Sequence, residues 1–573
     1  WVFKGSNVYH DALTDKYYAL VALSDGGKDA VVNREFDLDA KAFVDGGFVT
    51  PEAKQRISWE DKDTLLIGTD WGEGTLTESG YPFIVKRWKR GTALESAEEI
   101  MRGDREDVSL VSYRLELDSE RAVSILREAD TFFTATQYLL DGTEVTQLPL
   151  PKKCGINGVY QGWFLISLEE EWQPIPEQEA FQSGDLVAVP ADDFFETCQV
   201  NSAHLVFRPN ESQAVNGVAI SKHTAILSLN DTVVSRLVRI EPSADGGLWK
   251  QTDIALPGKN GRASVIFADR DEEEIFLAYE GFLTPDSLLN YDVESNSTSV
   301  LKSLPEKFDA SGLTVKQAFA TSTDGTKIPY FIVHRSDIEL DGSTPTLLYA
   351  YGGFQISMRP SYSATVGKLW LEKGGAYAVA NIRGGGEFGP NWHQAGLKTK
   401  RQIVYDDFIS VGEALVKDGV TKPEHLGIMG GSNGGLLMGV MLNQRPDLWN
   451  AVIVQVPLLD MLRYHLLLAG ASWVDEYGSP DVPEERAFLE QISPVHNFAA
   501  DKPYPTPLFV TSTKDDRVHP GHARKMAKLF QDADLPFYYY ENIDGGHSAA
   551  ANQIERAKRT ALEFTYLHER LFP

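Results

Sequence analysis

The stretch of sequence that decides the fold is His425-Leu-Gly-Ile-Met-Gly-Gly-Ser-Asn-Gly-Gly-Leu-Leu-Met438. Its apolar start predicts a buried strand, and the apolar segment after the glycines predicts a helix. The G-x-S-x-G pattern between them is typical of a nucleophile elbow, a sharp turn that lifts a serine hydroxyl clear of a sheet. Glycines suit such a turn because the neighbouring backbone comes too close for a Cβ. Ser432 is therefore a candidate nucleophile, and the Asn433 N–H at the helix N-terminus is a candidate oxyanion donor.

Partners for Ser432 follow later in the chain. Asp515 comes directly after one predicted strand, and His547 follows the next. Ser, then Asp, then His is the chain order of α/β-hydrolases, in which the histidine takes the serine proton and the carboxylate orients the imidazole. Asp516 also follows the strand, but Asp515 lies nearer its end. The alternative is a structural turn at Ser432 and a surface histidine at 547. The order and the strand-end positions together favour the catalytic interpretation.

The C-terminal half alternates apolar strands with helical patterns, which predicts a mostly parallel sheet with crossover helices. A β-hairpin around Asp324-Gly325 precedes it. The predicted strands are Thr346–Tyr349, Ala376–Asn381, Leu426–Met429, Ala451–Val456, Leu508–Thr511 and Phe537–Tyr540. The predicted helices are Val404–Lys417, Gly434–Arg445, Gly521–Gln531 and Asn552–Leu571. Open α/β sheets bind ligands at the carboxyl ends of their strands, where the glycine-rich and polar motifs of this half lie. Residues 313–573 are thus predicted to form an α/β-hydrolase domain.

The N-terminal half, residues 1–312, consists of short strand-like runs broken by turn residues, with few helical stripes. This pattern of short strands and frequent turns predicts a β-propeller or an array of β-sandwiches. At roughly 40–50 residues per blade, the region has room for about six or seven blades.

Composition narrows the class of partner. A formal net charge of −28 argues against nucleic acid, because phosphate binding requires a basic face. No apolar run is long enough to span a bilayer, so no membrane partner is expected. Cys154 and Cys198 are the two cysteines; whether they pair is open, and they form no disulfide framework. A cytoplasmic location is expected, with a periplasmic or secreted location as the open alternatives. A monomer is favoured, and the oligomeric state is open.

Two patterns resemble cofactor or metal motifs. Gly384 to Gly389 satisfies G-x-G-x-x-G after a strand, but Pro390 follows where a dinucleotide fingerprint would open a helix. His519 and His522 have a spacing that suits a metal, but no third ligand accompanies them, so solvent or helix-start roles are favoured. No cofactor and no metal are expected.

Several motifs, in order, are specific enough to indicate a family. These are Tyr351-Gly-Gly-Phe354, Asn381-Ile-Arg-Gly-Gly-Gly-Glu387, Gly430-Gly-Ser-Asn-Gly-Gly435, Asn443-Gln-Arg-Pro-Asp447, Asp515-Asp-Arg-Val518 and Gly546-His547. The chain resembles the prolyl oligopeptidase family, serine peptidases in which a seven-bladed β-propeller caps an α/β-hydrolase domain. The resemblance is strong from about Thr321 onward and weak in the propeller region. In that region, the segment that also resembles the family sequence is Ser79-Gly-Tyr-Pro-Phe-Ile-Val-Lys-Arg-Trp-Lys-Arg90.

The resemblance implies a role for each matching residue. Ser432 would be the nucleophile, Asp515 and His547 its partners, and the Asn433 N–H and the Tyr351 hydroxyl the oxyanion hole. Trp473 would stack on the proline ring of a substrate, and Arg517 would hold a substrate carbonyl. The remaining apolar lining would be Phe354, Leu458, Tyr477 and Val518.

Two departures from the family pattern stand out. Val456-Pro-Leu458 is bulkier than usual, which predicts a tighter or reshaped pocket. The family's catalytic domain also includes a segment before the propeller that this sequence is expected to lack. Together with the triad motifs, the resemblance implies a serine peptidase that cleaves short peptides after proline through an acyl-enzyme. An oligopeptidase or esterase of other specificity, and a non-catalytic propeller scaffold, are the alternatives.

Overall fold

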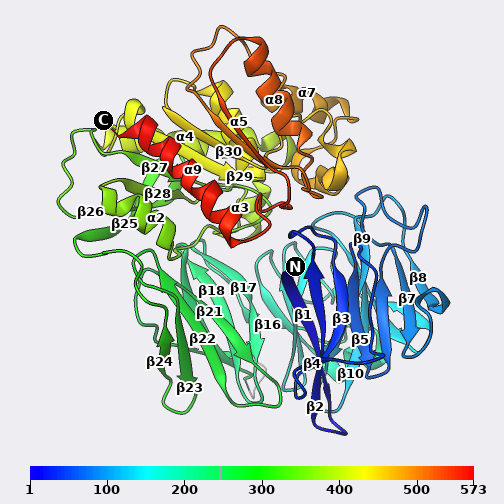
Figure 1. Ribbon diagram of the computed structural model, residues 1–573. Coiled ribbons are helices and arrows are strands. Elements are labelled where there is room, and N and C mark those ends of the chain that lie inside the picture. The colour runs from blue at the N-terminus through cyan, green and yellow to red at the C-terminus, as the bar shows by residue number, and fades with distance from the viewer. Residues whose placement is uncertain (244–247, 573) are drawn as a thin grey trace.

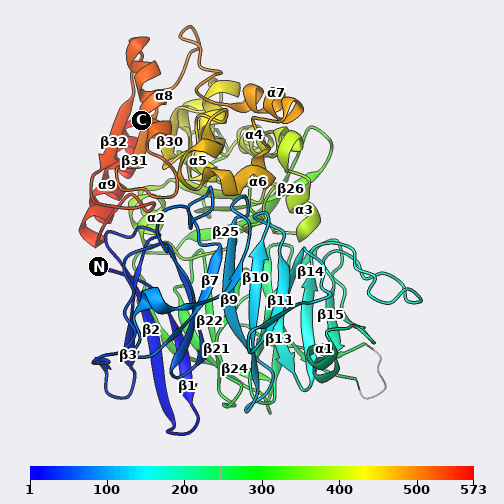
Figure 2. The ribbon, with the colours of Figure 1, turned by 90° about the vertical axis from the view of Figure 1, so that its right-hand side faces the viewer.

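The computed structural model describes residues 1–243 and 248–572, which fold into two domains stacked on each other (Figure 1). Strands from the N-terminal half form six separate four-stranded sheets below. The C-terminal half forms one eight-stranded sheet flanked by helices above. The N-terminus lies close to the junction of the two domains in both ribbon views (Figures 1 and 2).

The lower domain is a β-propeller in which every sheet contains four consecutive, antiparallel strands. The strands are β1 (Val2–Asp11), β2 (Lys16–Ser24), β3 (Val32–Asp37), β4 (Ala42–Phe43), β5 (Arg56–Asp61), β6 (Thr64–Gly68), β7 (Ile84–Lys89), β8 (Glu98–Arg102), β9 (Ser109–Glu116), β10 (Ala122–Ala129), β11 (Thr136–Asp141), β12 (Glu144–Gln147), β13 (Cys154–Tyr160), β14 (Trp163–Leu168), β15 (Leu186–Pro190), β16 (His204–Phe207), β17 (Gln213–Ile220), β18 (Ala225–Asp231), β19 (Val234–Glu241), β20 (Lys250–Asp253), β21 (Gly261–Ala268), β22 (Ile275–Gly281), β23 (Ser287–Asp292) and β24 (Ser297–Ser303).

The described residues thus form six blades, and the seven blades implied by the family resemblance are not supported. The sheets follow one another about every 50 residues because long connections lengthen each repeat. One such connection runs from Leu168 to Leu186. Cys154 and Cys198 are both free thiols, so the possible disulfide is not formed.

Apolar faces hold the blades together. Between the first and second sheets, Leu20 packs with Trp59, Leu65 and Ile67, all of them almost completely buried. Packing neighbouring blades face to face in this way gives each sheet a dry interior on both sides, which a single four-stranded sheet cannot achieve. The loops that join the strands then lie at the two ends of the domain, one of which faces the upper sheet (Figure 2).

The upper sheet has the order β25-β26-β28-β27-β29-β30-β31-β32. Its strands are β25 (Leu313–Thr321), β26 (Lys327–Arg335), β27 (Thr346–Tyr349), β28 (Ala376–Ala380), β29 (Leu426–Gly431), β30 (Ala451–Gln455), β31 (Leu508–Ser512) and β32 (Tyr538–Asn542). The first two form an antiparallel hairpin, and all pairs from β28 to β32 are parallel. Parallel strands need crossover connections, which put helices on both faces of the sheet.

Two apolar clusters fill the space between this sheet and its helices. One contains Phe408 of α4, Met441 of α5 and Phe530 of α8, and the other contains Val366 of α2 and Phe564 of α9. The helices are α1 (Ala191–Thr197) in the propeller, then α2 (Ala364–Leu369), α3 (Pro390–Gln394), α4 (Gln402–Lys417), α5 (Asn433–Gln444), α6 (Val474–Tyr477), α7 (Pro483–Ile492), α8 (Gly521–Asp532) and α9 (Gln553–Leu571). None of the helices in the described ranges is both long and apolar enough to cross a bilayer.

The six parallel-sheet strands and four long helices predicted from sequence are all confirmed, with ends that differ by at most two residues. The hairpin around Asp324-Gly325 is also confirmed, since Thr321 pairs with Lys327. The short helices α2, α3 and α6, together with α7, were not predicted. Their apolar stripes are too short or too weak to distinguish them from loops.

Candidate active site

Ser432 lies at the turn between strand β29 and helix α5. Its backbone has φ 59° and ψ −118°, a conformation that an L-residue adopts only under strain. A Cβ on Gly430 would lie 2.7 Å from the carbonyl carbon of Gly434, and one on Gly435 would lie 2.6 Å from the Gln455 oxygen. Glycine is therefore required on both sides of the serine. The Asn433 N–H belongs to the first turn of α5, where backbone donors have no partner within the helix.

Asp515 and His547 are hydrogen-bonded to each other. The Nδ1 atom of His547 lies 2.7 Å from Oδ2 of Asp515. The other carboxylate oxygen accepts the backbone N–H groups of Arg517 and Val518, each at 3.0 Å. The Asp515 side chain is completely buried, so these bonds fix both its position and its orientation. A carboxylate at Nδ1 favours the tautomer whose Nε2 atom is free to accept a proton.

Asp516, the rival candidate, points away from His547. Its carboxylate accepts the backbone N–H groups of Asp29, at 3.0 Å, and of Ala30, at 3.2 Å. Both belong to the loop between β2 and β3 of the propeller. The structure therefore separates two adjacent acids, one beside the histidine and the other at the domain junction.

The phenol of Tyr351 lies beside the Ser432 hydroxyl, and no hydrogen bond joins Ser432 to His547 among the described residues. Burial raises the pKa of Tyr351 to about 12, and the neighbouring Ser432 hydroxyl opposes that rise. The phenol is consequently neutral at ordinary pH and remains a hydrogen-bond donor beside the serine. Hydrogen bonds between a nucleophile and its base are often long before substrate binds.

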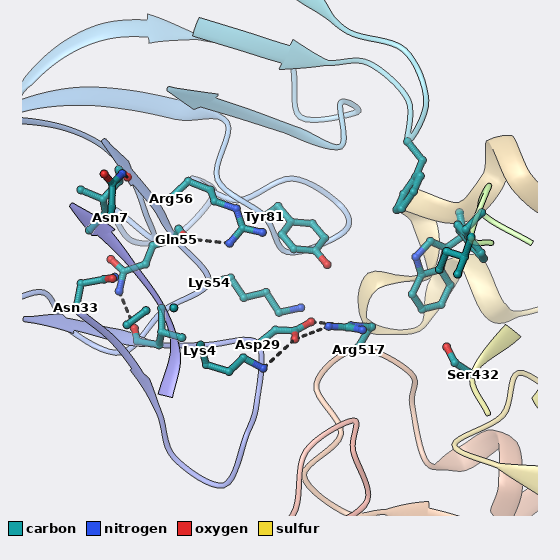
Figure 3. A pocket seen from close by; sticks show the side chains of 18 of the residues that line it. Lys4, Asn7, Asp29, Asn33, Lys54, Gln55, Arg56, Tyr81, Ser432 and Arg517 are labelled. Atoms are coloured by element: carbon teal, nitrogen blue, oxygen red, sulfur yellow. Dashed lines mark hydrogen bonds and ion pairs between the residues drawn. The ribbon is translucent and has the colours of Figure 1, made fainter. Parts of the chain in front are cut away.

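A cavity of about 560 Å³ lies between the two domains and has Ser432 on its wall (Figure 3). Five of the predicted substrate-binding residues also line it, namely Phe354, Leu458, Trp473, Tyr477 and Arg517. Val518 does not; it is buried behind the wall, where its N–H supports Asp515. A space of this size accommodates a short peptide segment.

Arg517 has a partner that the sequence did not suggest. Its Nε and Nη2 atoms form a two-pronged ion pair with the carboxylate of Asp29, at 2.8 and 2.7 Å. The guanidinium therefore joins the two domains, and only its Nη1 remains for the expected contact with a substrate carbonyl.

A buried charge network beneath the elbow was also missed. Arg401 donates to Glu476 at 2.6 Å and to the side-chain oxygen of Asn433, and Glu476 contacts His393 at 2.8 Å. Although burial alone would raise it, Arg401 and His393 hold the pKa of Glu476 below its ordinary value. The Tyr477 hydroxyl donates to the same Asn433 oxygen at 3.0 Å. Glu476 stands next to Tyr477 in the sequence, but its partner lies 75 residues away, so the pair carries no local signal.

The propeller contributes a second set of unpredicted lining residues. Lys54, Arg56, Tyr81 and Phe132 all face the cavity. Phe132 also packs edge-on against Phe354, with ring centroids 5.1 Å apart. Tyr81 belongs to the Ser79–Arg90 segment that resembles family text, which was the only signal for any of the four.

The G-x-G-x-x-G match proves to be a packing motif. Contrary to expectation, a short helix, α3, does begin at Pro390. The glycines nevertheless face protein. A Cβ on Gly384 would lie 2.7 Å from the Gly352 oxygen, and one on Gly386 would collide with the Gln355 carbonyl. Close backbone approach explains these glycines.

The fold and the site define a class, the α/β-hydrolases that carry a β-propeller, and comparison with known sequences identifies the family. Residues 360–571 match the profile of the prolyl oligopeptidase family, and residues 10–304 match that of the prolyl oligopeptidase N-terminal β-propeller domain. The chain belongs to the prolyl oligopeptidase family and is a serine peptidase.

Three relatives show how far the similarity extends. An uncharacterized peptidase of Sinorhizobium fredii is 49% identical over 576 residues, covering 100% of this chain and 78% of the relative. The prolyl endopeptidase of Elizabethkingia meningoseptica is 42% identical over 300 residues, covering 52% of this chain and 42% of the relative. The solved structure of a post-proline cleaving enzyme from Rickettsia typhi superposes with a TM-score of 0.93 at 32% identity, covering 100% of this chain and 84% of that one.

Proposed function

We propose that this peptidase hydrolyses short peptides on the carboxyl side of proline through an acyl-enzyme. Ser432 would attack the carbonyl of the proline residue, and His547 would accept the serine proton and return it to the leaving amine. Asp515 would hold the imidazole in the required tautomer. The Asn433 N–H and the Tyr351 phenol would stabilise the oxyanion.

The observation that carries the proline preference is the apolar end of the cavity. Trp473, Tyr477, Phe354 and Leu458 line the cavity together with Ser432. The rings of Phe354 and Tyr477 meet edge-to-face, with centroids 5.6 Å apart, which fixes the shape of this end. A pyrrolidine ring is compact and apolar and, once in a peptide bond, carries no N–H, so it loses no hydrogen bond there.

The domain arrangement supports short peptides as substrates. Side chains of both domains line the cavity together with Ser432, and the propeller lies against one side of the upper domain (Figure 2). A folded protein would have to unfold a segment to reach the serine, whereas a flexible peptide would not. The Rickettsia typhi structure, described as a post-proline cleaving enzyme, is consistent with this specificity.

The test is hydrolysis of a blocked Gly-Pro chromogenic amide, with Gly-Ala and Gly-Arg amides for comparison and Ser432→Ala as the control. Turnover of the proline amide alone, abolished in Ser432→Ala, is the expected result. Preference for the arginine or alanine amide would refute the proline specificity. Undiminished turnover in Ser432→Ala would refute the assignment of the nucleophile.

A further inference from the structure

The cavity wall opposite Ser432 is positively charged although the chain as a whole is strongly acidic. Among the described residues, four cationic side chains line the cavity, Lys4, Lys54, Arg56 and Arg517, against a single acidic one, Asp29. The formal charge of the chain is −28. A local excess of positive charge in an otherwise acidic molecule focuses the electrostatic field and attracts anions to this space.

Within the described chain, Asp29 lies within ion-pair distance of two of these cations. Its carboxylate pairs with Arg517 at 2.7 Å and lies 3.9 Å from the Lys4 ammonium. Figure 3 shows these contacts at the base of the cavity, with Lys54 extending between Asp29 and Tyr81. Lys54 and Arg56 form no ion pair with Asp29 within the described ranges.

Lys54 is half-buried and has no carboxylate within 4 Å in the described part of the chain. Its Nζ atom donates to the backbone oxygen of Asp516 at 2.9 Å and lies 4.9 Å from the centre of the Tyr81 ring. An ammonium group has three donors, so further donors are available. Burial lowers the pKa of Lys54, and the more distant carboxylates of Asp516 and Asp29 offset only part of that effect.

Arg56, the first residue of β5, is similarly unpaired. The one hydrogen bond that its side chain forms within the described ranges runs from Nη1 to the backbone oxygen of the adjacent Gln55, at 3.2 Å. No carboxylate of the described residues lies within 4 Å of its guanidinium. A guanidinium presents a planar set of donors that matches a carboxylate, and most of that set is free here.

We infer that Lys54 and Arg56 form a subsite that binds a carboxylate of the peptide substrate. The group is either an acidic side chain or a free C-terminal carboxylate, since both present the same pair of oxygens. This inference rests on the proposed function, because the same cavity must hold the scissile proline. Such a subsite makes the enzyme selective for acidic peptides over neutral and basic ones, although the net negative charge of the chain repels acidic peptides.

The experiment uses peptides of equal length with one proline at the cleaved position. The reference is neutral, with glutamine on each side and a C-terminal amide. Three others replace the glutamine before the proline by glutamate, the glutamine after it by glutamate, or the amide by a free carboxylate. A fifth peptide carries lysine in place of one of the two glutamines, at the position where glutamate has the larger effect. The three acidic peptides distinguish a side chain from a C-terminus as the source of the carboxylate.

The expected result is a kcat/KM about tenfold higher for at least one acidic peptide than for the reference, and lower for the lysine peptide. The ratio of kcat/KM for the acidic peptide to kcat/KM for the neutral reference should approach one in the Lys54→Gln/Arg56→Gln double variant. In the native chain this ratio should fall with added salt. Lys89→Gln, which removes an exposed cation from β7 of the same sheet as Arg56, should leave the ratio unchanged.

Equal kcat/KM values for acidic and neutral peptides would overturn the inference while leaving the proline specificity standing. A preference that persists in the double variant would overturn it as well. A protein that cleaves none of the five peptides after proline would refute the proposed function and the subsite with it.

Discussion

At the scale of single residues, the proposed proline recognition depends most on Trp473. Only 7% of its surface is exposed, yet it lines the cavity that contains Ser432. An isolated buried tryptophan is more often a packing residue than a binding one. The adjoining cavity distinguishes the two interpretations here, because a core residue would have no free space beside it.

Trp473→Ala should reduce kcat/KM for proline amides by about 100-fold, since the stacking surface and the shape of the pocket are lost together. A small activated ester, which needs little binding energy from this pocket, should lose no more than a fewfold. The comparison of the two substrates on one preparation is the measurement. Trp473→Phe serves as the matched control and should retain most of the proline activity. Equal losses on both substrates would contradict the stacking role.

The two histidines whose spacing suggested a metal both accept backbone hydrogen bonds; His519 has a helix-start role, as expected, whereas His522 is buried and serves a distant loop. His519 accepts the N–H of Gly521 at 2.9 Å, at the start of helix α8. His522 is completely buried, and burial lowers its pKa to about 4. Its Nδ1 atom accepts the N–H groups of Leu459 and Asp460, at 3.2 and 3.0 Å. Each imidazole accepts hydrogen bonds from backbone donors.

At the scale of elements, the loop after β28 contains a buried acid that couples stability to pH. Glu387 accepts the N–H of Met358 at 2.9 Å with one oxygen, and within the described chain its other oxygen has no partner. Burial raises the pKa of Glu387 to about 7. The unfolded chain therefore loses this proton at lower pH than the folded protein does. The stabilisation is complete below the unfolded pKa and is lost as pH rises towards 7.

The free energy of unfolding should consequently fall between about pH 4.5 and 7 by up to roughly 3 kcal/mol through this group. Glu387→Gln, which stays neutral, should remove that dependence, so the stability of the variant relative to the native chain should rise from pH 5 to pH 8. Urea unfolding at both values measures the difference. Glu339→Gln, at an exposed carboxylate, is the control and should show no such trend. A difference independent of pH would contradict the raised pKa.

At the scale of the whole molecule, the propeller loop between β2 and β3 contacts both loops that bear Asp515 and His547. Asp29 pairs with Arg517, and the backbone of Asp29 and Ala30 binds Asp516. The Gly26 oxygen accepts the N–H of Gly546 at 3.0 Å, one residue before His547. The first blade thus supports the acid and the base simultaneously.

Asp29→Asn should weaken this contact by about 1–2 kcal/mol, because the ion pair is partly exposed and loses only its charge-assisted part. We expect faster backbone hydrogen exchange in residues 515–518 and 544–548, and a kcat/KM reduced about tenfold. Asp45→Asn, at an exposed position beside β4 of the same sheet, is the control. Exchanging the charges in Asp29→Arg/Arg517→Asp should restore part of the protection. Unchanged exchange in both loops would contradict the supporting role.

The sequence alone determined the α/β-hydrolase sheet, its long helices, the elbow at Ser432 and the candidates Asp515 and His547. These features can be recognised from the sequence because apolar periodicity and the glycines around a serine are local patterns, and the order of Ser, Asp and His can be read along the chain. Tertiary structure alone decided the rest. It set six blades, separated Asp515 from Asp516, paired Arg517 with Asp29, and brought Lys54 and Arg56 to the cavity of Ser432. Each of these features depends on contacts between residues far apart in the chain. The physical reason is that charge pairing and cavity shape depend on distances in space, which cannot be read from the order of residues.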